Sequence, residues 1–270
     1  MPEGDTIHRT AAVLRRSLVG GVVRTARAQP GPGLARVPRL DRLVGRTVEA
    51  VEARGKHLLI RCSDGLLLRT HMRMRGSWHR YRPGEPWRLP ASRATCVLAT
   101  ATAVAVCFDA PEVELLTDAD LARHRALRTL GPDLLAPAFD ATEAVRRLRA
   151  HASVPLAEAL LDQRALAGIG NVYKSEICFV EGLDPWSPVS AVPDAALLHL
   201  VSTARRLLVA NADGGRRVTT AIPVPGSSLW VYGRAHRPCR RCGTRILGRR
   251  QGSQARMTYW CPRCQPSASR

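Results

Sequence analysis

The sequence predicts a multidomain α+β protein with an N-terminal helix and an antiparallel β domain, followed by a helical domain and a small cysteine-rich tail. Three observations predict this order. Apolar residues have helical spacing at the start of the chain, form short strand-like runs between residues 22 and 116, and return to helical spacing after Thr117. The 270 residues, of which 45% are hydrophobic, suffice for two domains with real cores.

The first element is an amphipathic helix that ends at Gly20-Gly21. Its apolar positions at helical spacing are Ile7, Ala11, Leu14 and Leu18. The strand-like runs that follow are residues 48–53, 57–62, 66–72, 96–99 and 104–108. Turn residues such as Pro83-Gly84 separate them, and short runs with such punctuation predict an antiparallel sandwich or barrel.

The second half of the chain is predicted to be helical. Expected helices cover residues 140–150, 155–162, 171–181 and 193–211, and residues 214–235 have no regular pattern. We therefore expect an N-terminal domain over residues 1–117, a linker over 118–135, a helical domain over 136–230 and a cysteine-rich domain over 231–270.

The charge is strongly unbalanced. Lys plus Arg number 41 and Asp plus Glu number 22, which gives a net charge of +19 and predicts a nucleic-acid partner. The alternative is a ribosomal or merely arginine-rich protein. Only Lys56 and Lys174 are lysines, and because arginine cannot lose its proton near neutral pH, each lysine indicates chemistry or a tight site. No window of 18 apolar residues exists and the chain starts with acidic residues, so we expect a cytoplasmic protein without membrane contact.

Four of the eight cysteines form a cluster at the C-terminus. Cys239-x2-Cys242 is followed after 18 residues by Cys261-x2-Cys264, a spacing that predicts a structural four-cysteine zinc site. Two disulfides are the alternative, which a cytosolic location disfavours. The intervening segment is expected to form a hairpin with strands at 244–247 and 255–260 and a turn near 248–252. The other cysteines, expected in the core, are Cys62, Cys96, Cys107 and Cys178.

A glycine-rich turn, Gly168-Ile169-Gly170, precedes the helix expected from Asn171. Glycines let the backbone turn tightly, and a helix that begins here aims its backbone N–H groups outward, which suits a phosphate. Helix connections also contain glycine for geometry alone, so this turn is a weak indication by itself.

Four segments, taken in order, resemble the formamidopyrimidine-DNA glycosylase/endonuclease VIII family over nearly the whole chain. They are residues 1–7, 55–57, 168–173 and 259–265. The resemblance implies a β-sandwich with a leading helix, a helix–two-turns–helix domain and a zinc finger holding one structural Zn²⁺. It also implies a monomeric, nucleoid-associated repair enzyme acting on double-stranded DNA with a damaged base or an abasic site. Gly4-Asp5-Thr6 resembles the endonuclease VIII branch, which implies oxidised pyrimidines as favoured substrates.

The resemblance assigns the catalytic roles to residues near the N-terminus and to one lysine. Pro2, once Met1 is removed, would attack the sugar and form an iminium, and β,δ-elimination would then cleave the strand. Glu3 would act as general acid/base, although a first-turn acid also stabilises a helix N-terminus. Lys56 would contact the phosphate beside the lesion; its alternative is an exposed lysine at a strand end.

The DNA-binding roles fall on five further residues. Asn171 and Arg256 match the family's phosphate contacts. A flipped base leaves a gap in the duplex, and Met74, flanked by Arg73 and Arg75, lies where the family places its wedge; its alternative is core packing.

Three other hypotheses remain at this point. They are a catalytically inactive damaged-DNA-binding relative, a zinc-ribbon module joined to an unrelated β domain, and a glycosylase preferring oxidised purines or abasic sites alone. Residues 214–232 depart from the pattern of the purine-acting branch and leave the pocket for the damaged base undefined.

Overall fold

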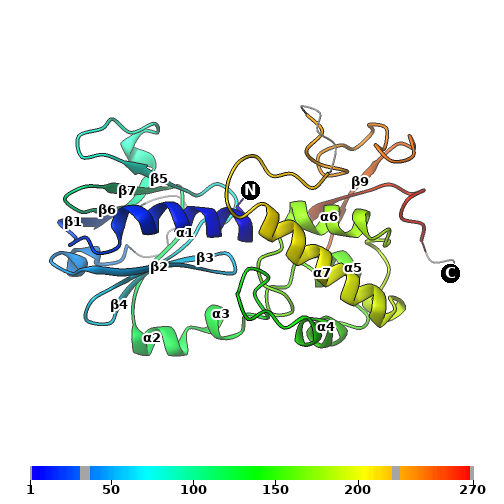
Figure 1. The fold of residues 1–270 in the computed structure, drawn as a ribbon, viewed down its shortest axis with the longest axis horizontal. Helices are drawn as coiled ribbons and strands as arrows, with labels where there is room; N and C mark the ends of the chain where they lie inside the picture. Colours follow the sequence, from blue (N-terminus) through cyan, green and yellow to red (C-terminus); the bar gives the residue numbers. More distant parts are fainter. Residues whose placement is uncertain (1, 31–36, 221–225, 268–270) are drawn as a thin grey trace. The chain divides into compact units, whose positions relative to one another are not determined.

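A computed structural model describes residues 2–30, 37–220 and 226–267 of the chain (Figure 1). It divides into two compact units, Met1–Thr129 and Leu130–Arg270, and each is described by itself. Met1, whose removal the expected chemistry requires, and residues 221–225 of the irregular segment lie outside the described residues.

The first unit pairs helix α1 (Gly4–Leu18) with two four-stranded antiparallel sheets, ordered β2-β3-β4-β8 and β1-β6-β7-β5. Their apolar faces enclose a continuous core, so the predicted antiparallel sandwich is confirmed. The strands are β1 (Thr25–Ala28), β2 (Val48–Arg54), β3 (His57–Cys62), β4 (Leu66–His71), β5 (Ser77–Tyr81), β6 (Ala94–Ala99), β7 (Val104–Phe108) and β8 (Glu112–Thr117).

The predicted N-terminal helix is confirmed, because all four of its expected apolar positions are buried: Ile7, Ala11, Leu14 and Leu18. The helix packs against β2, β3 and β5 (Figure 1). Three strands were not predicted. β1, β5 and β8 lack the apolar runs that marked the others, because polar and charged residues make up half or more of each strand.

Short helices complete this unit. α2 (Asp118–Arg123) starts with a capping box, in which the Thr117 hydroxyl accepts a hydrogen bond from the Asp120 backbone N–H and the Asp120 carboxylate accepts one from the Thr117 backbone N–H. α3 (Arg125–Arg128) follows directly. Both lie in the stretch expected as a linker. The 3₁₀ helices are η1 (Leu40–Leu43) and η2 (Ala91–Arg93).

The second unit contains the predicted helices, with one difference in length. They are α4 (Ala141–Arg149), α5 (Leu156–Ala159), α6 (Asn171–Val180) and α7 (Asp194–Ala210), with the 3₁₀ helix η3 (Val189–Ala191). The helix predicted over 155–162 has only four residues. The Asp162 carboxylate accepts a hydrogen bond from the Arg164 backbone N–H at 2.9 Å, a local bond that favours a turn over a continued helix.

The C-terminal hairpin is present but shifted from its predicted position. β9 (Leu247–Gln251) pairs with β10 (Arg256–Trp260), so the turn lies at residues 252–255. The prediction of a first strand at 244–247 and a turn near 248–252 was wrong. Thr244 is held instead in the cysteine turn, where its backbone carbonyl accepts a hydrogen bond from the Cys239 N–H at 2.8 Å.

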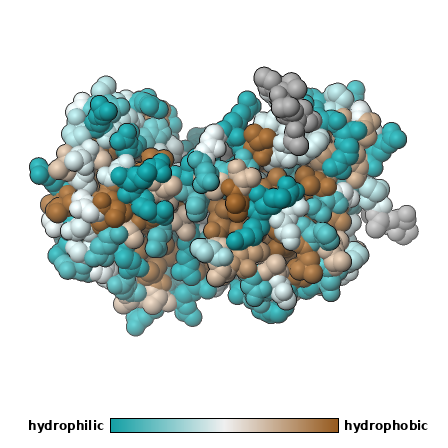
Figure 2. All heavy atoms as spheres, viewed as in Figure 1, coloured by the Kyte–Doolittle hydropathy of each residue, from teal (hydrophilic) through white to brown (hydrophobic). Residues whose placement is uncertain are grey.

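All four scattered cysteines are buried, as predicted: Cys62, Cys96, Cys107 and Cys178. On the face drawn in Figure 2, hydrophobic residues form small patches separated by hydrophilic ones. Among the helices of the described ranges, none has both the length and the apolar character needed to cross a bilayer.

Candidate functional site

Strand register places the N-terminus of α1 at one end of the sandwich. The Gly20 N–H donates to the Val48 carbonyl and the Arg15 Nε donates to the Val51 carbonyl, each at 2.9 Å. α1 therefore runs antiparallel to β2. Going back along the helix toward its first residue leads toward the end of β2, where the chain turns into β3.

The turn between β2 and β3 consists of Gly55 and Lys56 alone, because Arg54 pairs with His57. Gly55 has a φ of +57° at the first central position, where a tight hairpin requires a residue that tolerates positive φ. Lys56 occupies the second position and is only partly exposed. The predicted lysine is thus presented at the tip of a hairpin, at the same end of the sandwich as the start of α1.

Pro2 and Glu3 lie at that start. Glu3 is completely buried and is the N-cap residue of α1, whose first helical hydrogen bond joins the Ile7 N–H to the Glu3 carbonyl at 3.0 Å. Pro2 is half-buried beside it. A carboxylate at a helix N-terminus interacts favourably with the helix dipole. The structure therefore agrees with the interpretation of Glu3 as an acid that stabilises the helix N-terminus.

The loop expected to carry the wedge, residues 71–76, leaves β4 at the same end, since His71, the last residue of β4, pairs with His57 across the sheet. The Gly76 N–H donates to the Met72 carbonyl at 2.8 Å, and a Cβ on Gly76 would lie 2.7 Å from that oxygen, so the loop closes only with glycine there. Met72 is 1% exposed, whereas Met74 is 50% exposed. Met72 is therefore the methionine that packs in the core, and core packing, the alternative for Met74, does not describe Met74.

A surface cavity of about 510 Å³ lies beside this loop. Its lining residues are Arg73, Met74, Arg75, Arg93, Asp109 and Pro111. Three of the six are arginines, and one of them, Arg93, forms an ion pair with Asp109. A second lining arginine, Arg73, forms an ion pair with Glu112. A hollow lined by arginines next to a protruding apolar side chain fits an extended polyanion with an unstacked base.

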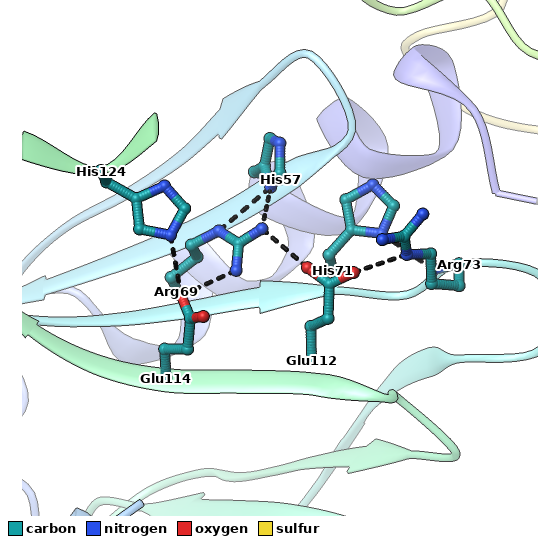
Figure 3. Close-up of polar contacts among 7 residues, drawn as sticks. All are labelled: His57, Arg69, His71, Arg73, Glu112, Glu114 and His124. Atoms are coloured by element: carbon teal, nitrogen blue, oxygen red, sulfur yellow. Dashed lines mark hydrogen bonds and ion pairs between the residues drawn. The ribbon is translucent and has the colours of Figure 1, made fainter. Parts of the chain in front are cut away.

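A buried arginine behind this end of the sheet was not predicted (Figure 3). The Arg69 side chain is 2% exposed and donates hydrogen bonds to Glu112 and Glu114 on β8, each at 2.8 Å. Its Nε also donates to the His57 Nδ1 at 3.1 Å, which requires a neutral His57 with its proton on Nε2. The sequence offers one indication: an arginine directly follows three leucines within the expected strand.

The pKa values at this end follow from burial and from the arginines. Burial, reinforced by the Arg69 charge, lowers the pKa of His57 to about 2, and burial likewise lowers the pKa of His71 to about 4. Burial alone would raise the pKa of the Glu112 carboxyl, but the Arg69 hydrogen bond and the neighbouring charges bring it below its ordinary value. Both imidazoles are therefore neutral and Glu112 is ionised at neutral pH.

The second unit presents Asn171 at the start of α6, directly after Gly168-Ile169-Gly170. Gly168 has a φ of +107°, which favours glycine, and Gly170 is the N-cap residue. Asn171 is 8% exposed, and its Nδ2 donates to the Met257 carbonyl at 3.0 Å. Asn171 thus joins the N-terminus of α6 to strand β10, on which Arg256 also lies.

Lys174, the second lysine, occupies a tight site. It is 1% exposed, and its Nζ donates to the Thr258 hydroxyl at 2.8 Å and to the Met257 carbonyl at 3.3 Å. Of the two interpretations offered for an isolated lysine, the tight site is the one found here. The contact fastens the second turn of α6 to the middle of β10.

Glu176 was also missed by the sequence analysis. It is fully buried on α6, and its carboxylate accepts hydrogen bonds from the backbone N–H groups of Trp230, Val231 and Tyr232 at 2.7–2.8 Å, as well as from the Thr219 hydroxyl. Burial raises the pKa of this carboxyl despite the hydrogen bonds. The carboxylate thereby orders the segment that leads into the cysteine cluster.

The four tail cysteines converge as predicted, with all Sγ atoms within 4.8 Å of one another. The Cys239–Cys264 and Cys242–Cys261 sulfur atoms are 3.9 and 3.5 Å apart. Tetrahedral coordination with a metal–sulfur bond of about 2.3 Å requires sulfur separations of roughly 3.8 Å. The four thiols therefore fit a single metal ion.

The hairpin tip packs against α5. Gly252 has a φ of +70°, and a Cβ there would lie 2.6 Å from the Glu158 carboxylate, so the approach requires glycine. A cavity of about 470 Å³ lies here, lined by α5, residues 161–164 and the hairpin, including Arg256. Arg249 and Arg250 are both exposed, and the Arg249 guanidinium is stacked 3.8 Å from the centre of the Trp186 ring.

Comparison with known proteins gives this architecture a family. The profile of the formamidopyrimidine-DNA glycosylase N-terminal domain matches residues 1–130, and that of the formamidopyrimidine-DNA glycosylase H2TH domain matches residues 130–221. A Streptomyces coelicolor protein named "Probable endonuclease 8 2" is 46% identical over 98% of this chain and 94% of its own length. The chain belongs to the formamidopyrimidine-DNA glycosylase/endonuclease VIII family.

Other relatives place the chain within this family. "DNA-(apurinic or apyrimidinic site) lyase Nei2" of Mycolicibacterium smegmatis is 42% identical over 99% of the chain and 100% of its own length. A formamidopyrimidine-DNA glycosylase of Geotalea uraniireducens is 31% identical over 98% of both chains. The fold of a Lactococcus lactis family member, solved in a complex with abasic-site DNA, has a TM-score of 0.81 at 21% identity, covering 98% of this chain and 100% of that one. The predicted family and fold are thereby confirmed.

Proposed function

We propose that this protein is a base-excision-repair DNA glycosylase that removes oxidised bases, pyrimidines favoured, and cleaves the resulting abasic site. The observation that carries the proposal is the convergence of Pro2, Glu3, Lys56 and the Met74 loop at one end of the sandwich in a chain 46% identical to a probable endonuclease 8. The relatives named endonuclease 8 are 42–46% identical, against 31% for the Geotalea formamidopyrimidine-DNA glycosylase, which favours the pyrimidine-acting branch.

Pro2 is the proposed nucleophile. After removal of Met1, its secondary amine attacks the anomeric carbon of the damaged nucleotide, and the base leaves with its bonding electrons and is protonated. The amine nitrogen then forms an iminium with the opened sugar, which acidifies the adjacent carbon. Loss of that proton expels the 3′ phosphate, and a second elimination expels the 5′ phosphate. An N-terminal amine, with a pKa of about 7.7–8.0 for ordinary residues, has its nucleophilic form accessible near neutral pH.

Glu3 and Lys56 serve this chemistry. Glu3 protonates the ring oxygen as the sugar opens and later moves protons during elimination. Its position at the start of α1, next to Pro2 in the chain, supports this role. Lys56, at the tip of the β2–β3 turn, contacts the phosphate beside the lesion and stabilises developing negative charge.

Double-stranded DNA containing a damaged base or an abasic site is the proposed partner. Solved relatives from Lactococcus lactis hold DNA with an abasic site or a Fapy-dG lesion. Asn171 and Arg256 are proposed to bind phosphates, and the bond from Asn171 to the strand of Arg256 supports a joint role. Met74 is proposed to fill the gap left by the flipped base, with Arg73 and Arg75 beside it.

The metal is proposed to be one structural Zn²⁺ bound by Cys239, Cys242, Cys261 and Cys264. Four thiolates complete a tetrahedral shell and leave no position for substrate, so the ion would stabilise the hairpin rather than take part in catalysis. We further propose that the protein is a monomer that associates with the nucleoid in the cytoplasm. Its proposed parts are a catalytic domain over residues 1–117, a linker over 118–135, a helix–two-turns–helix domain over 136–230 and a zinc finger over 231–270.

Borohydride trapping tests the proposed chemistry. Purified protein, with loss of Met1 established by mass spectrometry, is incubated with duplexes containing an oxidised pyrimidine, an oxidised purine or an abasic site, and borohydride is added. An iminium is reduced to a stable protein–DNA adduct, and we expect most adduct with the pyrimidine and abasic duplexes.

The controls separate chemistry from binding. Pro2→Thr should abolish trapping while leaving DNA affinity unchanged, whereas Arg256→Ala should weaken affinity and leave trapping intact at saturating protein. Damage-specific binding without any adduct would instead identify a catalytically inactive damaged-DNA-binding protein.

A further inference from the structure

One carboxylate links the buried arginine of the β sheet to the loop that carries Met74 (Figure 3). Glu112 Oε2 accepts a hydrogen bond from Arg69 at 2.8 Å, and Glu112 Oε1 accepts one from the Arg73 Nε at 2.5 Å. Glu112 lies at the first position of β8, where it pairs with His71, the last residue of β4. The link therefore spans the point at which the chain leaves the sheet.

The sheet side of this link is firmly held. Arg69 is almost completely buried and also binds Glu114 and His57, so its guanidinium has partners on strands β3 and β8. Glu114 in turn accepts a hydrogen bond from the His124 Nε2 at 3.0 Å. Because charge-assisted hydrogen bonds in a buried site are strong and directional, the Arg69 guanidinium gives Glu112 a fixed orientation.

The loop side needs such support. Arg73 has a φ of +46°, the left-handed region that disfavours a residue with a side chain. Two contacts hold it there: the His71 Nδ1 accepts a hydrogen bond from the Arg73 backbone N–H at 3.2 Å, and Glu112 binds the guanidinium. The neighbouring residue along the chain is Met74, half-exposed at the loop's apex. The backbone conformation of Arg73 therefore contributes to the direction in which Met74 projects.

We propose that Glu112 is a positioning residue that, through Arg73, holds loop 71–76 in the conformation that presents Met74 to the DNA. This inference rests on the proposed function, because insertion of Met74 belongs to it. It assigns Arg73 a structural task, in which its charge is neutralised by Glu112. It also assigns the Arg69 cluster the task of anchoring the wedge to the sheet that carries Lys56.

Glu114 offers a matched control. Glu112→Gln and Glu114→Gln each remove one charged partner of Arg69, on the same strand and two residues apart. Of the two carboxylates, Glu112 is the one that also binds Arg73. A merely structural role of the cluster predicts similar losses of activity from both variants, whereas the positioning role predicts a loss of wedge insertion confined to Glu112→Gln.

The experiment measures insertion directly, with 2-aminopurine placed opposite a stable abasic-site analogue, so that displacement of this base raises its fluorescence. Wild type, Glu112→Gln, Glu114→Gln, Arg73→Gln and Met74→Ala are compared at saturating protein. We expect Met74→Ala, Arg73→Gln and Glu112→Gln to lose most of the fluorescence change, and their rate of base removal from intact duplex to fall about tenfold. Glu114→Gln should retain the wild-type change, and Arg73→Gln with Glu112→Gln should be no worse than either alone.

A second substrate distinguishes positioning from damage to the catalytic centre. In a duplex that lacks the nucleotide opposite the abasic site, no base has to be displaced, so Glu112→Gln should be trapped by borohydride as fast as wild type. If Met74→Ala leaves the fluorescence change intact, Met74 is not a wedge and both the proposed role and this inference fail. If Met74→Ala abolishes the change while Glu112→Gln keeps it or increases it, the wedge stands and the positioning role of Glu112 is overturned.

Discussion

The two units hold their functional elements in different ways. At the end of the sandwich, Lys56 and the Met74 loop follow directly on paired strands, so strand register fixes where each begins. The buried charge cluster around Arg69 binds the Met74 loop through Glu112 and Arg73. In the second unit, side chains of α6 hold the C-terminal hairpin, through Asn171 and Lys174, and the segment before the cysteines, through Glu176. Four cysteines converge at the base of the hairpin. Backbone pairing between strands survives the loss of one side chain, whereas a contact made by a single side chain is lost with it. We therefore expect loss of the metal or of the Glu176 carboxylate to affect the second unit most, and acidification to affect the sandwich.

Loss of the metal should have the largest effect. A structural zinc ion contributes an apparent ~10–16 kcal/mol in zinc-finger peptides, which is comparable to the whole stability of a domain. Cys239→Ala should therefore remove the metal and unfold the hairpin, with loss of hydrogen-exchange protection in residues 247–260 and of Arg256-dependent DNA binding. Metal content and hydrogen exchange measure this. Cys178→Ala, which changes a buried cysteine outside the cluster, should retain the metal; unchanged folding and metal content in Cys239→Ala would contradict the zinc site.

Glu176→Gln should come next. Its carboxylate accepts three backbone N–H groups in a fully buried site, and an amide presents a donor where these groups need an acceptor. We expect the second unit to lose ~3 kcal/mol of unfolding free energy, because hydrogen bonds to a charged group are worth more than neutral ones. Denaturant unfolding checks this, with Glu181→Gln at the end of the same helix as control. Equal stability of the two variants would show that the Glu176 carboxylate does not stabilise the segment before the cysteines.

Sequence patterns predicted the elements whose determinants are local. The spacing of Ile7, Ala11, Leu14 and Leu18 is sufficient for α1, and the two Cys-x2-Cys pairs are sufficient for the metal cluster. The Arg69 cluster could not be predicted, because its acids lie 43 and 45 residues away and meet Arg69 only through the pairing of β4 with β8.

The wedge loop shows the same limit at shorter range. Met72 and Met74 are equivalent by composition, and which one is buried depends on the positive φ of Arg73 and on the closure at Gly76. The hairpin was misplaced because β9 contains Gly248, Arg249 and Arg250, which lack strand propensity, and forms through pairing with β10. Local patterns thus located the site residues along the chain, but the contacts that orient them depend on tertiary structure.

Acidification should weaken the sandwich. The pKa of His57 is about 2 in the folded protein and near 6.5 when unfolded, so the unfolded chain binds the extra proton between these values, and stability falls as pH drops below 6.5. At pH 5 the cost is ~2 kcal/mol for this group, because protonation of Nδ1 would break its bond with Arg69. His71, with a folded pKa of about 4, acts in the same direction.

Thermal unfolding of wild type and His57→Asn at pH 7 and pH 5 measures the effect. The asparagine oxygen can still accept from Arg69 but does not titrate, so the variant should lose less stability than wild type between the two pH values. An equal loss in both proteins would show that His57 is not buried in its neutral form.

The smallest expected effect is at Lys174 on α6, which binds the hairpin, and it tests whether this contact matters for DNA binding rather than for folding. Lys174→Met keeps the length of the side chain, and the Met257 carbonyl that loses the lysine still accepts a hydrogen bond from Asn171, so little stability should be lost. Thr258 keeps its hydrogen bond to Gln251, so β10 should stay folded, but its tie to α6 is lost. DNA affinity should then fall about fivefold, or ~1 kcal/mol, because Arg256 and Asn171 are no longer held together as firmly.

Thr258→Val removes the same contact from the other side, so the double variant should bind no worse than either single one. Additive losses would mean that Lys174 acts on DNA binding through another contact, and the comparison between strand register and side-chain contacts would then have to be drawn at Glu176 alone.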